Sequence, residues 1–441
     1  MKANAITAAA LGAVLLFGAC GCGVTGMGRE ALLRPPKTMG AEAELEQLIE
    51  LAAGGSYTLK YPKNGSNRNA IIMRDLDGDG VDEAIAFFRK QDNDAGVHML
   101  VMFKKDEHWN AANDVHVANP DVDCVDFADL DTGNTLEILV GYTTYAEANS
   151  LQVYTYQAGV VSKYAEGEQN YTNFYCGFMD NSGKSKVVSL YEGKAHMLEY
   201  DSARNALFVQ ASIAIDSKVV SYKNVTFTEL NKGVNGLLMD GVLPGGMNTQ
   251  VLYYDQQQGV LLNPLYKENM ENITQRSREL LSACFDNDMG YEIPNIQSRS
   301  AGDDGDGDAD FVVWNRFVVS DNNDYKLETA RRTVVNYPYA YTVTISPDRA
   351  EDSFTFQTRD NGAILSFFET DADNPLFEIR VFKLADWESG KNTEKYQLIR
   401  KDNSCAYTFR NYHRNTPSAP EDDDIKNAFS LLDRGVIGTV G

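Results

Sequence analysis

The stretch Asp75-Leu76-Asp77-Gly78-Asp79-Gly80-Val81-Asp82-Glu83 leads directly into a strand-forming run, Ala84 to Phe88. An apolar residue followed by Asp recurs five times, at intervals of 46 to 60 residues, and a strand-forming run follows each pair. The pairs are Leu76-Asp77, Leu130-Asp131, Met179-Asp180, Met239-Asp240 and Phe285-Asp286. This interval is the length of a four-stranded propeller blade. The sequence therefore predicts one repeated β architecture for most of the chain.

The first two periods each hold four short β-rich runs, which is the strand count of a blade. The third and fourth periods are looser, and Glu268 to Leu281 is interpreted as a helical insert. The fifth period is one strand short, whereas a strand at Ala70 to Arg74 has no blade of its own. If that strand completes the last blade, the ring closes without an open edge. We therefore expect a mainly β fold with a β-propeller of about five blades.

The repeat stops near Asn336, which divides the expected folded part in two. Residues 41–336 form the propeller, together with a short amphipathic helix at Ala41 to Ala53. Residues 337–441 hold several alternating strands and a terminal helix at Asp423 to Leu432, which predicts a small α+β domain.

Residues 75–83 have the composition of a calcium loop. Calcium requires six to eight oxygen ligands on a sharply folded chain. Asp75, Asp77, Asp79 and Glu83 supply carboxylates, and the two glycines among them allow the chain to fold sharply. An EF-hand is excluded because Ala86 occupies its twelfth position and strands flank the loop. Without a cation the clustered carboxylates would repel one another, so the sequence predicts calcium here.

The pattern resembles the FG-GAP or VCBS repeat, the blade unit of integrin α-subunits and many bacterial surface proteins, over roughly residues 65–335. The resemblance implies weaker metal loops at Asp129, Asp131 and Glu137, and at Asp286, Asp288 and Glu292. Around Asp180 and Asp240 most carboxylates are lost, and Lys186 replaces the Glu, so these aspartates are interpreted as turn residues. The acidic run 303–310 is interpreted as a flexible loop out of phase with the repeat.

The N-terminus has the order of an export signal, with Lys2 before a short apolar run and small residues before a cysteine. Residues 17–20, Phe-Gly-Ala-Cys, resemble a bacterial lipobox. This resemblance implies a signal peptide at 1–19 and a lipid on Cys20 that holds the protein on the outer face of the cell membrane. Residues 20–40 then form a tether. The other five cysteines show no metal or redox spacing, although one bridge between neighbouring units stays open.

A formal charge of −23 argues against nucleic acid and anionic lipid as partners and favours cations and basic or neutral partners. No nucleophile, metalloprotease or phosphate-loop motif is present in the sequence. We therefore expect a non-catalytic, calcium-stabilised platform that binds a surface protein or glycan. Two alternatives stay open: an extracellular polysaccharide hydrolase or lyase that uses calcium, and an accessory protein of envelope assembly or secretion.

Overall fold

The computed structural model describes residues 40–91, 95–146, 149–165, 169–231, 233–268, 270, 272–285, 290–297, 307–320, 324–391, 393–412 and 420–437. Within these ranges the chain is mainly β, and its antiparallel strands form six sheets. Cys20 and the rest of the expected signal peptide and tether lie outside the described residues. None of the described helices combines the length and the apolar character needed to cross a membrane.

The first sheet follows helix α2 (Ala41–Ala53), whose bounds confirm the expected N-terminal helix. Its strands are β1 (Tyr57–Lys60), β2 (Ile71–Arg74), β3 (Glu83–Lys90), β4 (Val97–Lys105), β5 (His108–Ala111) and β6 (Val115–Val117). β2 pairs with β3. The expected closure of a ring through residues 70–74 is therefore wrong, because this strand belongs to the first sheet and not to the last.

The next three sheets are antiparallel meanders in chain order. The second contains β7 (Asp121–Ala128), β8 (Glu137–Thr143), β9 (Asn149–Gln157), β10 (Val160–Lys163) and β11 (Gln169–Tyr171). The third contains β12 (Asn173–Gly177), β13 (Lys186–Tyr191), β14 (Lys194–Asp201) and β15 (Ala206–Ala214). The fourth contains β16 (Ser221–Asn231), β17 (Val234–Leu243), β18 (Gly246–Asp255) and β19 (Val260–Leu262). The described part of 268–281 forms turns and isolated bridges, so the expected helical insert is wrong.

The fifth sheet crosses the expected boundary at residue 336. It contains β20 (Glu292–Gln297), β21 (Ala309–Val319), β22 (Tyr325–Asn336), β23 (Tyr341–Thr344) and the late strand β29 (Phe429–Leu431). The sixth sheet contains β24 (Phe354–Arg359), β25 (Ile364–Glu369), β26 (Phe377–Lys383), β27 (Gln397–Lys401) and β28 (Cys405–Asn411), with the short helices η1 (Glu351–Ser353) and α3 (Leu384–Glu388). Helix α4 (Asp422–Ala428) ends four residues before the expected Leu432, because the chain then pairs with β23 as β29.

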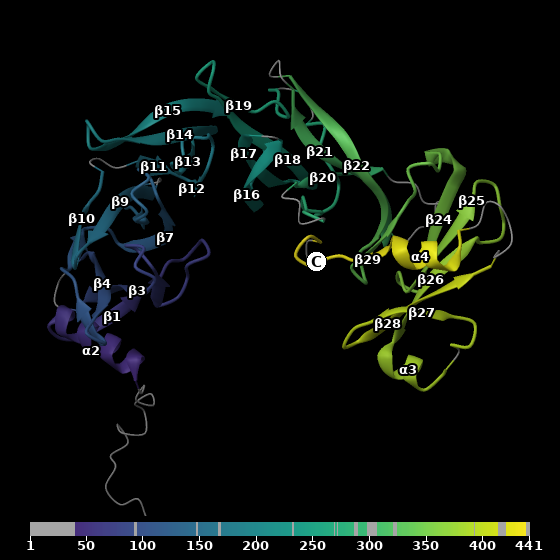
Figure 1. Ribbon diagram of the computed structural model, residues 1–441, viewed down its shortest axis with the longest axis horizontal. Helices are drawn as coiled ribbons and strands as arrows, with labels where there is room; N and C mark the ends of the chain where they lie inside the picture. The colour runs from purple at the N-terminus through teal and green to yellow at the C-terminus, as the bar shows by residue number, and fades with distance from the viewer. Residues whose placement is uncertain are drawn as a thin grey trace, which may run out of the picture.

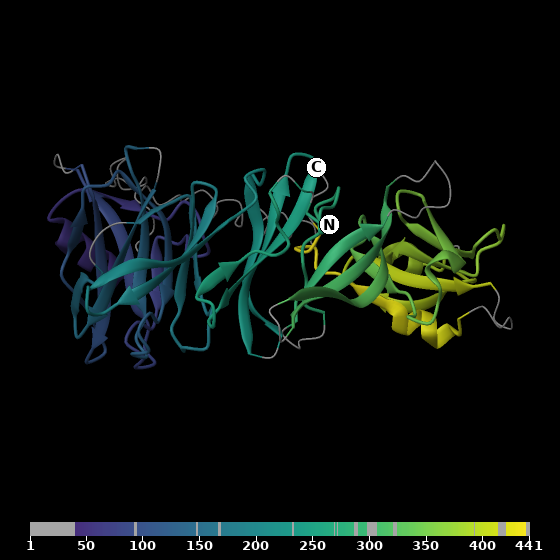
Figure 2. The ribbon, with the colours of Figure 1, turned by 90° about the horizontal axis from the view of Figure 1, so that it is seen from above.

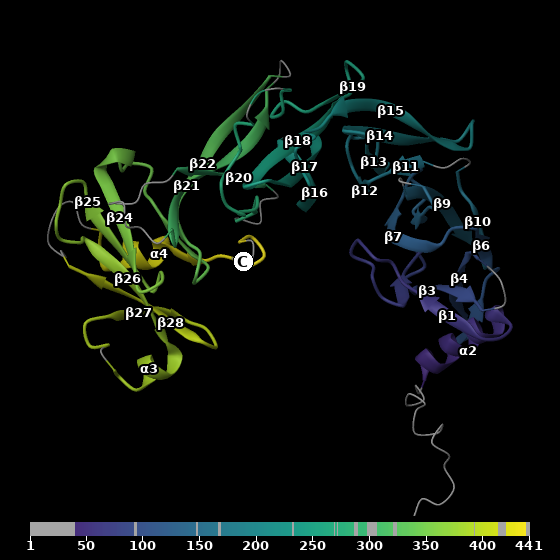
Figure 3. The same cartoon turned by 180° about the vertical axis from the view of Figure 1, so that it is seen from behind.

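The six sheets follow one another along an open arch, with the first and sixth at opposite ends (Figures 1 and 3). Seen from above, they succeed one another along the long axis (Figure 2). Each interface between neighbours has its own hydrophobic core, as in repeat proteins, where each unit contacts only its neighbours. The arch positions the loops of successive sheets beside one another.

A helix covers the first end of the arch, which explains why the arch does not close there. In the first sheet, Ile85 and Phe87 of β3 face the second sheet, whereas the alternate residues Ala86 and Phe88 pack on Ile49 of α2. This two-residue alternation gives the sheet two apolar faces. Helix α2 covers the face that a closing sheet would need. At the other end, the sixth sheet packs on the fifth.

Candidate metal centre

Residues 75–82 form the bend between β2 and β3, which we call the first aspartyl bend. Equivalent bends join β7 to β8 at residues 129–136 and β12 to β13 at residues 178–185; these are the second and third aspartyl bends. In all three sheets the bend connects two consecutive strands that pair with each other, β2 with β3, β7 with β8 and β12 with β13. The repeat seen in the sequence therefore corresponds to a repeated position in the first three sheets.

The first bend is folded by its own carboxylates. Asp75 accepts hydrogen bonds from the N–H groups of Gly78 at 2.8 Å and Gly80 at 3.0 Å. Asp79 accepts one from Val81 at 2.7 Å. Gly78 and Gly80 both have positive φ, and a Cβ on Gly78 would lie 2.7 Å from the Asn134 carbonyl oxygen of the second bend. The aspartates and glycines are therefore required for the fold of the loop, whether or not a ligand binds there.

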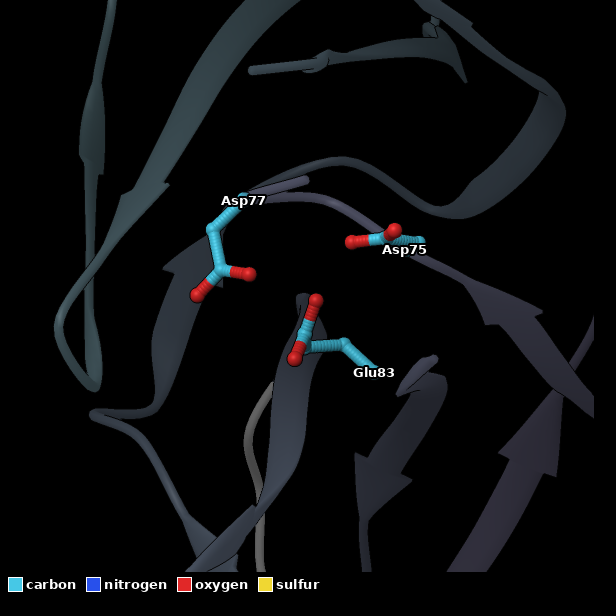
Figure 4. A group of neighbouring side chains, drawn as sticks. All are labelled: Asp75, Asp77 and Glu83. Atoms are coloured by element: carbon cyan, nitrogen blue, oxygen red, sulfur yellow. The ribbon is translucent and has the colours of Figure 1, made fainter. Parts of the chain in front are cut away.

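Three carboxylates converge at this bend. One ligand oxygen from each of Asp75, Asp77 and Glu83 lies within 4.8 Å of the others, and the side chains point toward one another in Figure 4. Among the described residues this is the only such group of three metal-ligating side chains. Asp79, the fourth expected ligand, is not part of it. The structure thus brings together three of the four predicted ligands, and calcium at this site stays a prediction.

Glu83 is the buried member of the cluster. It is the first residue of β3, is only 3% exposed, and accepts a hydrogen bond from the Leu76 N–H at 2.9 Å through Oε2. Burial raises its pKa to about 7, and the negative charges of Asp77, Asp79 and Asp75 add to that shift. A bound divalent cation would neutralise these carboxylates and remove the repulsion between their negative charges. Carboxylate oxygens are the ligands that calcium prefers, so the three residues fit that ion.

The second bend has the same local fold as the first, but its three carboxylates do not converge in the same way. Asp129 accepts hydrogen bonds from Thr132 and Asn134, and Glu137 accepts one from the Leu130 N–H at 2.9 Å. Burial, followed by the nearby aspartates, raises the pKa of Glu137 to about 7. The Tyr164 hydroxyl donates to Asp131 at 2.9 Å, so a phenol already satisfies one ligand oxygen. A metal at Asp129, Asp131 and Glu137 stays a prediction.

In the third bend a lysine side chain supplies the positive charge. Lys186 is the first residue of β13, the position that Glu83 and Glu137 hold in β3 and β8. Its ammonium lies 3.2 Å from Asp180 and 2.8 Å from Glu199, and its side chain is 1% exposed. Because this ammonium neutralises the carboxylates, the bend has no need of a metal ion. This arrangement agrees with the interpretation of Asp180 as a turn residue.

Asp240 does not lie in a bend, so its place in the predicted repeat is wrong. It lies inside β17, is fully buried, and pairs with Arg276 at 3.0 Å. The hydroxyls of Thr249 and Ser282 donate to the same carboxylate. The fourth sheet instead joins its first two strands through a short connection between Asn231 and Val234.

Only one residue of the fifth predicted copy lies within the described residues. Asp286 and Asp288 lie outside the described residues. Glu292 is fully buried and is neutralised by Arg331 at 2.6 Å and Arg316 at 3.4 Å, which makes it a poor partner for a metal ion. A metal ion at Glu292 stays a prediction, and the charges of these two arginines disfavour it.

The acidic run 303–310 follows β20 in the chain, and its last two residues, Ala309 and Asp310, begin β21. Residues 303–306 lie outside the described residues, so the interpretation of the run as a flexible loop out of phase with the repeat stays a prediction. In its described part, Asp310 pairs with Arg278 at 2.8 Å.

Neighbouring bends are hydrogen-bonded in series. The Leu136 N–H of the second bend donates to the Leu76 carbonyl of the first, and the Ser185 N–H of the third donates to the Asp129 carbonyl of the second, both at 2.8 Å. These hydrogen bonds tie the position of the first bend to the junction between the first two sheets.

The histidines of the first sheet form a packed pair. His98 is 4% exposed, its ring lies 4.7 Å from that of His116, and its Nδ1 is 2.8 Å from Asp114. This agrees with a structural role. The four described cysteines, Cys124, Cys176, Cys284 and Cys405, are all free thiols.

No family model matches the chain, and no curated protein matches its sequence. Among solved structures, a protein from Lactobacillus plantarum aligns over 72% of this chain and 96% of its own length, with 11% identity and a TM-score of 0.32. Fructan 1-exohydrolase IIa from Cichorium intybus aligns over 68% of this chain and 63% of its own length, with 10% identity and a TM-score of 0.27. Both TM-scores are low, so these similarities carry no conclusion about activity or ligand.

Proposed function

We propose that this chain is an exported, lipid-anchored surface protein whose folded part is a calcium-stabilised, non-catalytic binding platform for a protein or glycan. The observation that carries the proposal is the convergence of Asp75, Asp77 and Glu83 at the first aspartyl bend. Three carboxylates in that space, one of them buried, repel one another unless a cation or a proton is bound. Calcium is the cation whose ligand preference they match.

The role of the ion follows from the contacts of the bend. Calcium would be held by Asp75, Asp77 and Glu83, and it would neutralise their charges. Glu83 begins β3, and the Leu76 carbonyl accepts the Leu136 N–H of the second bend. The bound ion would therefore fix the junction between the first and second sheets. Because the ion binds the folded chain only, it would also raise the free energy of unfolding.

The proposed location rests on the N-terminal sequence. Residues 1–19 have the order of an export signal, and Cys20 stands where a lipobox cysteine carries lipid. Helix α2 follows the proposed tether directly and packs on the first sheet, so the anchor would join the arch at that end. This leaves the loops of the arch and the sixth sheet as surfaces for a partner.

The test is calcium titration of the mature protein by isothermal calorimetry, together with thermal unfolding in calcium and in EDTA. Asp77→Asn removes one converging carboxylate. Asp201→Asn is the matched control, because Asp201 also folds a turn, through the Ala203 N–H, and is outside the cluster. We expect Asp77→Asn to weaken calcium binding about tenfold or more and Asp201→Asn to leave it unchanged.

Two results would overturn the proposal. The first is an unfolding midpoint and a calorimetric trace that calcium does not change. The second is the release of products from envelope polysaccharides by the mature protein, which would make it a hydrolase or lyase.

A further inference from the structure

One cavity lies far from the aspartyl bends, in the C-terminal part of the chain. Its volume is about 600 Å³, which is within the usual range for ligand sites. One wall is the end of β23 and the residues that follow it, and the other wall is helix α4. Sheet strands β24, β25 and β26 form the floor, and Figure 1 shows them beside α4.

The floor of this cavity is aromatic. Phe354, Phe367 and Phe377 come from three neighbouring strands, and the rings of Phe367 and Phe377 stack at 4.5 Å. Val343 and Ile425 complete the apolar surface from the two walls. All five side chains are at most 7% exposed, so the strands and α4 hold them in place. Such a surface fits an apolar side chain or ring and offers little to a sugar hydroxyl.

Asp424 and Arg349 are the charged residues of the cavity lining. The rim, by which we mean the exposed residues next to the lining in the chain, is mainly acidic. It includes Asp348 and Asp352 after β23, and Asp423 in the first turn of α4, whose side chain is 85% exposed and pairs with Lys426 at 2.9 Å. The whole chain carries a formal charge of −23. An apolar pocket inside an acidic rim complements a partner that presents an apolar group between positive charges.

The sheet beside the pocket ends at an edge strand. β24 is the first strand in the order β24-β25-β26-β28-β27, and among the described strands it pairs only with β25. An edge strand can accept an extended peptide through main-chain hydrogen bonds, while pockets beside it accept alternate side chains. Phe354 is both the first residue of β24 and part of the cavity floor.

From these observations we infer that the cavity under α4 binds a basic, extended peptide segment of a partner protein. One aromatic or large aliphatic side chain of that segment fills the cavity, and flanking Lys or Arg residues face the acidic rim. The inference rests on the proposed function only in treating the chain as a binding protein, and it specifies the partner as a cationic protein segment. It does not depend on calcium.

The test uses the full mature protein and short fluorescein-labelled synthetic peptides, with binding measured by fluorescence anisotropy. The first peptide has one central Phe flanked by lysines. In the second, Ala replaces the Phe, and in the third, Glu replaces the lysines. We expect the first to bind, the second to bind about tenfold more weakly or worse, and the third not to bind.

Protein variants locate the site. Asn427→Trp places an indole in the cavity from an exposed position of α4, and Thr344→Tyr does so from an exposed position of β23. Two independent variants keep the test valid if one of them fails to fold. Ala385→Trp is the control, because Ala385 is exposed on α3 and outside the cavity lining. We expect about a tenfold loss of affinity in each cavity variant that folds, and none in the control.

Equal binding of the Phe and Ala peptides, or binding that neither cavity variant weakens, would overturn the inference. So would binding of an uncharged apolar dye in the cavity with no binding of any peptide, which would indicate a small-molecule site. Calcium titration of the same samples separates the two proposals: a protein that binds calcium and no basic peptide overturns only this inference.

Discussion

Protons and calcium should compete for the carboxylates of the first aspartyl bend. A change of pH from 6 to 8 tests this competition, because it should change the affinity for calcium. Burial and three neighbouring aspartates raise the pKa of Glu83 to about 7. Calcium binds the ionised carboxylate, so its binding must displace the proton that Glu83 holds at pH 6. Asp75 and Asp77, which share the cluster, would face the same ion.

The expected magnitude follows from the pKa. With a value of about 7, Glu83 is roughly one-tenth ionised at pH 6 and roughly nine-tenths ionised at pH 8. If only the ionised form binds, the apparent dissociation constant for calcium falls about tenfold between these pH values. Near pH 6, binding should release nearly one proton from Glu83 for each ion bound.

The same shift predicts the pH dependence of stability without calcium. The pKa of Glu83 is raised in the folded state, so its contribution to stability is present below about 4.5 and is lost as the pH rises through about 7. We expect a loss of about 2 kcal/mol in the free energy of unfolding, a value reduced for solvent screening of the exposed aspartates. Calcium at pH 8 should restore it.

The assay is isothermal calorimetry in two buffers of different ionisation enthalpy, which counts the protons released, with urea unfolding alongside. Glu83→Gln should bind calcium weakly and without pH dependence. Glu137→Gln, at the equivalent position of the second bend, should keep the tenfold change of the wild type. An affinity that is constant from pH 6 to pH 8, or a Glu83→Gln variant that keeps the tenfold change, would refute the reasoning.

Three further predictions concern stability. Lys186→Met leaves Asp180 and Glu199 without their buried ammonium and should cost about 3–5 kcal/mol in urea unfolding; a loss under 1 kcal/mol would show that water replaces it. Arg276→Met leaves Asp240 fully buried without its guanidinium partner and should have a similar cost in urea unfolding; a variant as stable as the wild type would contradict this. Ile49→Ala removes the centre of the α2 contact and should cost about 2–5 kcal/mol in thermal unfolding, whereas Leu51→Ala on the exposed side of α2 should cost little.

The aspartyl bends show how far local sequence could lead. Asp, Gly and a following apolar run fix a turn and a strand through hydrogen bonds only two to five residues apart, so the bends of the first three sheets were predictable. The pair Met239-Asp240 has the same local signature and lies inside a strand, because Arg276, distant in the sequence, neutralises it there. The converging ligands at the first bend were predictable from spacing, whereas the exclusion of Asp79 was not.

By itself, the sequence determined the mainly β class, helix α2, the repeated bends and the carboxylates suited to a cation, because each depends on contacts between residues close along the chain. Only the tertiary structure decided that the sheets form a capped arch, that β29 returns to the fifth sheet, and that α4 covers an aromatic cavity. These features depend on which apolar faces meet. Because a strand with two apolar faces can be covered equally well by a helix or by another sheet, the pattern of its residues cannot specify which neighbour it receives.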